Sequence, residues 1–247
     1  MGIKYRQDDD LAFLQYCTED DLKVLARYST HDKDELQRTT SELLEDMEFK
    51  SHAGKPDQYQ RCWQLIAGEI QHFGGDTFVN VFRGGGVLYK EILSDVCDKL
   101  TVKIDKKSSA YEIENKLLEK IIYDSWEKMN SEQQEELLKG VGLDGMLQGA
   151  AGLLALQAAL RLGGAASYQV STLLAGSVAN MLAGRTLAIA AGGGLGRGLA
   201  VLGGPIGLAV ATILTVPAIS GAAYRVTIPS VIQLAYMRRA YEKRNRF

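Results

Sequence analysis

Residues 198–239 read GLAVLGGPIGLAVATILTVPAISGAAYRVTIPSVIQLAYMRR, and Arg225 is the only charged side chain before the final arginine pair. The same character extends further, because residues 145–237 contain four arginines and no other charged residue. A water-exposed surface of this size normally carries charges of both signs. We therefore expect this region to be shielded from water, either in a protein core or in a membrane.

The chain divides into two parts of opposite charge. Residues 1–144 hold 29 acidic and 19 basic residues, a net charge of −10, whereas residues 145–247 hold one acidic and nine basic residues, a net charge of +8. The two parts could attract each other, or the basic part could meet an anionic surface while the acidic part stays in water. We predict a soluble acidic helical domain at 1–140 and a Gly/Ala-rich apolar helical region with a basic tail at 141–247.

Helix-start signals recur in the first part. Ser109 with Glu112, and Ser131 with Gln134, have the spacing of capping boxes. Apolar residues follow with a helical period, and few segments alternate as a strand does. The sequence therefore predicts an all-α fold, in which an acidic amphipathic-helix domain precedes a Gly/Ala-rich apolar helical region with a basic C-terminal helix.

The longest uncharged window, 198–224, would form a helix of about 40 Å, against a hydrocarbon core of ~30 Å. Glycines and a proline at 203–205 and Pro217 interrupt it, so the apolar stretch 206–216 fits a hairpin arm better than a full span. The predicted membrane-contact residues are Leu199, Val201, Leu202, Ile206, Leu208, Val210, Ile213, Leu214 and Val216. Glycine pairs four apart, such as Gly203 and Gly207, allow close helix packing, which predicts a possible homo-oligomer.

The C-terminus supplies a second membrane signal. The apolar run 228–237, with Pro229 in the first turn of a helix, is followed by basic residues, as in the positive-inside pattern. The alternative is an ordinary helix end, where cations favour the negative end of the helix dipole. The predicted contacts with anionic lipid are Arg238, Arg239, Lys243, Arg244 and Arg246.

Four residues near the glycine turns are candidates for chemistry or for a partner surface: Glu69, His72, Asp76 and Arg83. Glu69 and His72 have the spacing used in di-iron bundles, but the second copy that such a site needs is missing. The sequence thus predicts no metal and no cofactor, and an enzyme using these residues as acid–base and anion-holding groups is the weakest hypothesis. The acidic first part argues against nucleic acid as a partner.

The three cysteines, Cys17, Cys62 and Cys97, form no CxxC pair, which is typical of a reducing compartment. The N-terminus, MGIKYRQDDD, lacks the apolar run of a secretion signal. We expect synthesis in the cytoplasm, with the protein at the cytoplasmic face of the inner membrane or inserted in it.

Four stretches resemble the YaaW-like family of uncharacterised bacterial proteins: CTEDDL at 17–22, WQLIAGEIQHFGGD at 63–76, FRGGGVLYKEILSDVCDKL at 82–100 and SGAAYRVTIPSVIQLAYMRR at 220–239. The resemblance covers about 5–240 and brings no catalytic residues with it. A more distant link to the ubiquinol–cytochrome c chaperone domain implies a helical domain that handles other proteins at a membrane.

Two functional hypotheses follow. The main one is a non-enzymatic, membrane-interacting protein that inserts an apolar helical hairpin into a bilayer, as pore formers do. The alternative is a soluble all-α interaction or chaperone-like module whose second part is its buried core. The first predicts a lipid bilayer as the partner and the second predicts a protein.

Overall fold

The computed structural model describes residues 2–32, 34, 36–75, 86–143, 145, 149–182 and 223–245. Within these residues the chain is all-helical, as predicted, and its one strand-like pairing is an isolated bridge between His31 and Gln37. The helices are η1 (Ala12–Tyr16), α1 (Glu19–Thr30), η2 (Leu43–Glu45), α2 (Met47–Ser51), α3 (Gln58–Arg61), α4 (Trp63–Gly75), α5 (Tyr89–Lys99), α6 (Ala110–Trp126), α7 (Ser131–Gly140), α8 (Ala150–Leu162), α9 (Gly164–Leu182) and α12 (Tyr224–Asn245).

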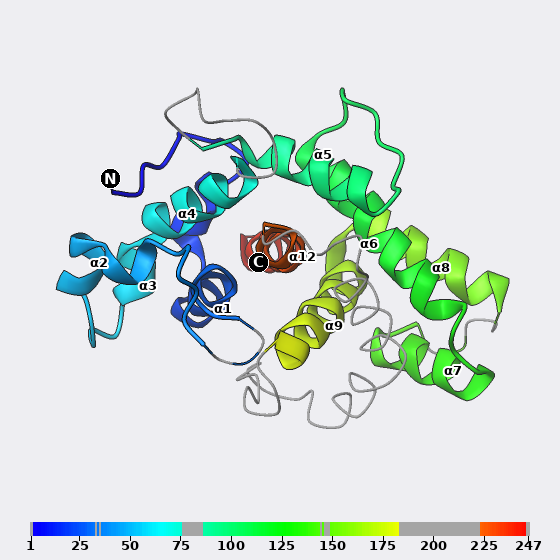
Figure 1. The fold of residues 1–247 in the computed structure, drawn as a ribbon. Coiled ribbons are helices and arrows are strands. Elements are labelled where there is room, and N and C mark those ends of the chain that lie inside the picture. The colour runs from blue at the N-terminus through cyan, green and yellow to red at the C-terminus, as the bar shows by residue number, and fades with distance from the viewer. Residues whose placement is uncertain are drawn as a thin grey trace.

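The C-terminal helix α12 occupies the centre of the molecule. Figure 1 shows it end-on, surrounded by α1, α4, α5, α6 and α9, all of which contact it. Its side chains from Val226 to Ala240 are buried, except that Tyr236 and Arg238 are partly exposed. A helix enclosed on every side is normally apolar all round, yet α12 carries two arginines on its enclosed part. Those charges need partners inside the protein.

Side-chain caps explain where several helices begin. Ser109 and Glu112 form the predicted capping box at the start of α6. The capping box of α7 begins one residue earlier than predicted, because Asn130 and Gln133 satisfy each other's backbone N–H groups. The predicted place of Pro229 was also wrong, since α12 begins at Tyr224 and the proline lies inside the helix.

One hydrophobic core joins both parts of the sequence. It includes Leu22 and Leu117 from the acidic part and Leu160, Val178 and Val231 from the charge-poor part. Helix α12, which follows residue 140 in the sequence, packs against α1 and α4, which precede it. The division of the chain into separate domains at that residue stays a prediction.

Among the described helices, none is by itself both long and apolar enough to cross a bilayer. Helices α8 and α9 together are long and apolar enough to span a bilayer, but the chain bends by 105° between them. The predicted membrane-contact residues between Leu199 and Val216 lie outside the described part of the chain, as do Gly203 and Gly207.

The N-terminal segment is fixed to α4 at a glycine. A Cβ atom added at Gly68 would lie 2.8 Å from Ile3 Cγ2 and 3.1 Å from the backbone nitrogen of Tyr5. One turn away, the Gln71 side chain accepts a hydrogen bond from the Arg6 N–H and donates one to its carbonyl, both at 2.9 Å. Gly68 therefore permits the close approach that these bonds need.

Replacing this glycine should destabilise the protein. Alanine is normally better than glycine inside a helix by about 1 kcal/mol, but in Gly68→Ala the new methyl group meets the N-terminal segment. We expect a lower free energy of unfolding in urea. Gly140→Ala is the matched control, because no atom lies within 4 Å of a Cβ at that position. Equal effects of the two substitutions would contradict this account of the packing.

Residues 1–140 alone should not form the ring of helices, because the fragment lacks the helix on which the ring packs. We expect helical circular dichroism without a sharp thermal transition, compared with a cooperative transition for the full chain. A fragment that unfolds cooperatively and keeps native near-ultraviolet circular dichroism would instead support an independent first domain.

Candidate functional site

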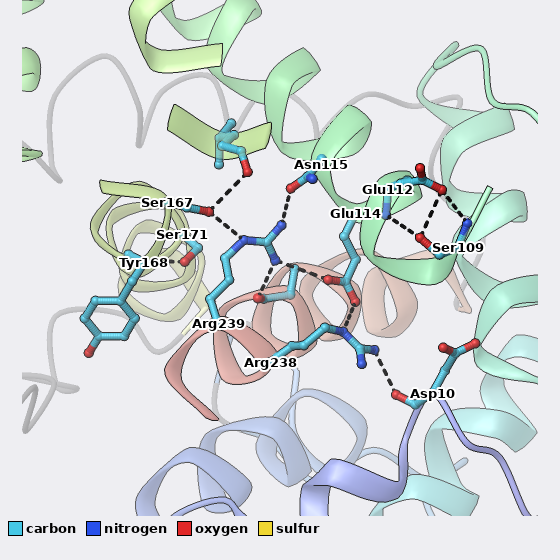
Figure 2. A network of polar contacts seen from close by, with 12 residues as sticks. Asp10, Ser109, Glu112, Glu114, Asn115, Ser167, Tyr168, Ser171, Arg238 and Arg239 are labelled. Carbon is cyan, nitrogen blue, oxygen red and sulfur yellow. Dashed lines mark hydrogen bonds and ion pairs between the residues drawn. The ribbon is translucent and has the colours of Figure 1, made fainter. Parts of the chain in front are cut away.

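A charged cluster joins α6 to the end of α12 in the protein interior. The carboxylate of Glu114 is fully buried and lies between two guanidinium groups (Figure 2). Arg238 Nε donates to Glu114 Oε1 at 3.0 Å, and Arg239 Nη1 donates to Oε2 at 3.1 Å. One acidic residue thus holds two consecutive arginines of the central helix.

Arg239 is enclosed completely, with 2% of its side chain exposed. Its Nε donates to Ser167 Oγ of α9 at 3.1 Å, and its Nη2 donates to the Asn115 side chain. Its Nη1 also donates to the Ala235 carbonyl at 2.6 Å, and its guanidinium lies 4.7 Å from the centre of the Tyr111 ring. This one side chain therefore connects α6, α9 and α12.

Arg238 connects the same carboxylate to the N-terminal segment. Its Nη2 donates to the Asp10 carbonyl at 2.8 Å, and its guanidinium lies 4.5 Å from the centre of the Phe13 ring. Tyr89, the first residue of α5, donates its hydroxyl to Glu114 Oε1 at 3.0 Å. Together the two arginines bring five segments of the chain to one buried carboxylate.

Burial and charge act together on the ionisable groups here. Burial raises the pKa of Tyr89 well above its usual value, and the charge of Glu114 raises it further, so the phenol stays protonated and donates. For Arg238, burial is the largest single influence and lowers the pKa, but Glu114, Tyr89 and Asp10 together raise it by more, and the net pKa lies above its ordinary value. Burial raises the pKa of Asp10, and Arg238 opposes that shift.

The cluster is built as a structural anchor. Both oxygens of Glu114 accept hydrogen bonds from protein groups, and Arg239 has a protein acceptor on each of its three nitrogens. A buried ion pair of this kind is stable only when its remaining donors and acceptors are satisfied. The geometry therefore positions α12.

The predicted lipid-contact residues do not share one surface. Arg238 and Arg239 bind Glu114 inside the protein. Lys243 Nζ lies 4.3 Å from the centre of the Tyr168 ring, and Arg244 Nη2 donates to the Tyr16 carbonyl at 3.2 Å. Arg246 lies outside the described residues.

Of the predicted partner surface, the structure describes Glu69 and His72. Glu69 is 2% exposed and accepts hydrogen bonds from the Ser41 hydroxyl at 2.6 Å and from the backbone N–H groups of Glu42 and Leu43. Burial raises the pKa of Glu69, and these donors oppose the shift. Glu69 thus fixes the segment before η2 to α4. His72 is half-buried on the same helix, and positions 76 and 83 lie outside the described residues.

The described part of the chain contains neither a metal-binding cluster nor a reactive cysteine. No group of three histidine, cysteine or acidic side chains there could hold a metal ion. Cys17, Cys62 and Cys97 are free and buried. Burial raises the pKa of each thiol, to about 12, about 11 and about 12 respectively, so none is a reactive thiolate at neutral pH.

Sequence reasoning missed Glu114, although a signal was present. The residue lies on the apolar stripe of α6, four positions after Ala110 and four before Leu118, both of which are buried. An acidic residue on a buried stripe needs a cation, and the excess positive charge of the last part of the chain supplies two. The opposite net charges of the two parts have the signs that this pairing of Glu114 with two arginines requires.

Known proteins resemble the chain in sequence over nearly its whole length. Over 239 residues the chain is 44% identical to the UPF0174 protein YaaW of Escherichia coli (strain K12), covering 97% of both chains. It is 36% identical over 245 residues to a UPF0174 protein of Helicobacter pylori (strain J99), covering 98% of this chain and 96% of the relative. The model of the ubiquinol-cytochrome C chaperone family matches residues 58–232, and that of a domain of unknown function (DUF3944) matches 5–39. No solved structure matches the chain.

The prediction of a membrane-inserting, pore-former-like protein was wrong. The chaperone-family match runs from α3 into α12, and no described helix is long and apolar enough by itself to cross a bilayer. These findings favour the alternative, an all-α interaction or chaperone-like module. Arg238 and Arg239 bind Glu114 and were wrongly assigned to lipid, whereas Lys243, Arg244 and Arg246 as lipid contacts stay a prediction. Cytoplasmic synthesis stays a prediction.

Removing the central carboxylate should cost much stability. Glu114→Ala leaves two guanidinium groups without their carboxylate, which costs about 3–5 kcal/mol for a buried pair. The control is Glu119→Ala, which breaks the more exposed pair with Arg161 and should cost less than about 1 kcal/mol. Urea unfolding measures both.

A third variant separates charge from packing. Replacing the cluster together, as Glu114→Leu with Arg238→Met and Arg239→Met, removes all three charges at similar volume and should be less destabilising than Glu114→Ala alone. A single substitution at Glu114 that costs no more than the control would contradict an anchoring role.

Proposed function

The chain belongs to the UPF0174 family of YaaW-like proteins, and from this premise we propose that it is a chaperone-like module that binds another protein. The observation that carries the proposal is the match of the ubiquinol-cytochrome C chaperone model to residues 58–232. The matched range begins at α3 and ends inside α12, so it takes in most of the helices that surround the centre.

The described architecture supports a binding role. The charged cluster around Glu114 is fully bonded within the protein, and Glu69 is bonded to the segment before η2. Glu69, Arg238 and Arg239, which sequence analysis singled out, thus fix the fold. A rigid interior of this kind leaves the outer faces of the peripheral helices for recognition, which is how helical binding modules present a preorganised surface.

An aggregation assay tests the proposal. Citrate synthase diluted from guanidinium chloride is the unfolded probe, and a protein that binds unfolded chains should lower its light scattering. We expect scattering to fall as the full chain is added and then to saturate. Serum albumin at equal mass is the control for nonspecific protection. Scattering that stays unchanged at a large excess of the chain would count against the chaperone-like function.

A further inference from the structure

Helix α8 exposes an unusual row of apolar side chains. Leu154 and Leu162 are 64% and 83% exposed, and Ala151 and Ala158, which are also exposed, fall on the same face at spacings of three and four. A row from 151 to 162 measures about 16 Å along the helix. The opposite face, with Leu156 and Leu160, is buried in the core. The helix is therefore apolar on both sides, and only one side is covered.

The neighbouring helix α6 carries a further exposed apolar side chain. Arg161 Nε and Nη2 donate to the two oxygens of Glu119 of α6, both at 2.7 Å. One turn further along α6, Tyr123 is 45% exposed. Figure 1 shows α8 at the edge of the molecule, outside the ring around α12 and next to α6 and α7. We call Tyr123 and the four exposed α8 residues the α8 face.

The surroundings of the α8 face are acidic. Residues 119–139 contain six acidic and three basic residues, and 150–160 contain none of either. Glu132 and Glu136 are exposed on α7, which contacts α8, and Glu127 is exposed at the end of α6; the exposed bases of the same segments are Lys128 and Lys139. Arg161, the cation of α8, is already paired with Glu119. The face thus combines an apolar row with an excess of negative charge beside it.

We propose that the α8 face binds a cationic amphipathic helix of a partner protein. Leucines at helical spacing on the partner would cover Leu154 and Leu162, and its lysines or arginines would lie against the acids of α6 and α7. The inference rests on the proposed function, since it names the partner segment that such a module would hold. Exposed apolar rows with a polar border are typical of interaction sites.

Charge also decides against two other occupants. An anionic lipid surface would be repelled by the acidic border. A second copy docked through the same face would bring the two acidic borders together, because a two-fold interface places the same patch on both sides. A cationic helix satisfies both the apolar row and the charge.

A labelled peptide tests the inference. The probe is fluorescein-LKKLLKLLKKLLKL, with an anionic version that has glutamate at every lysine. Fluorescence anisotropy with the full chain should show binding of the cationic peptide, weakened by added salt, and much weaker binding of the anionic one. Equal binding of the two peptides would overturn the electrostatic part of the proposal.

Two pairs of substitutions locate the binding face. Leu154→Ser with Leu162→Ser should weaken binding of the cationic peptide by about tenfold or more, as the loss of even one buried leucine contact predicts. The matched control is Leu36→Ser with Met47→Ser, which removes two exposed apolar side chains that lie outside α6, α7 and α8 and should leave binding unchanged. Equal effects of the two pairs would refute the α8 face as the site.

Further outcomes distinguish this inference from the proposed function. If the double variant Leu154→Ser, Leu162→Ser binds the peptide normally and the full chain still protects citrate synthase, the α8 face is not the binding site and the proposed function stands. If the full chain neither binds the peptide nor protects citrate synthase, both fail. Two results would assign the face to another occupant and overturn the inference. In one, the full chain sediments as an oligomer and the double variant Leu154→Ser, Leu162→Ser sediments as a monomer. In the other, the full chain binds phosphatidylglycerol vesicles and the double variant does not.

Discussion

The salt bridges from Glu114 to Arg238 and Arg239 are the constraint on which this fold depends. An isolated charge in a protein interior costs far more than folding can supply, so neither arginine could enter without a carboxylate beside it. Glu114 bonds to both, and further donors and acceptors from α5, α6, α9 and the N-terminal segment complete the cluster. Because its geometry is specific, the cluster fixes the position of α12 along its axis and the face that it turns to α6.

The central place of α12 then determines the arrangement of the other helices. The helices α1, α4, α5, α6 and α9 and the short η1 contact it, and small residues let α9 pack along it, with Ser167 and Ser171 buried. Apolar packing supplies most of the driving force, with Val231 and Leu234 fully enclosed. One acidic residue of the first part of the chain meets two basic residues of the last part here.

Local sequence signals predicted the helices better than their arrangement. The Ser109–Glu112 capping box follows from a few adjacent residues, and it was predictable for that reason. The burial of Arg239 depends on Glu114, 125 residues away, and such pairing leaves no local pattern. A run of apolar residues followed by cations suits a membrane as well as a core, so the partner of the run had to come from tertiary structure. The exposed apolar row of α8 could not be predicted either, because both sides of that helix are apolar and the sequence does not show which side is covered.

Native-state hydrogen exchange tests the central place of α12 most directly. The account predicts that the backbone N–H groups of residues 228–237, apart from Pro229, which has none, exchange only through global unfolding. Local opening of one surrounding helix would not expose them to water. Their opening free energy should equal the unfolding free energy measured in urea. Exchange of these amides at a clearly lower free energy than the amides of α1 and α4 would contradict it, because α12 would then be a detachable element on a core built by the first part of the chain.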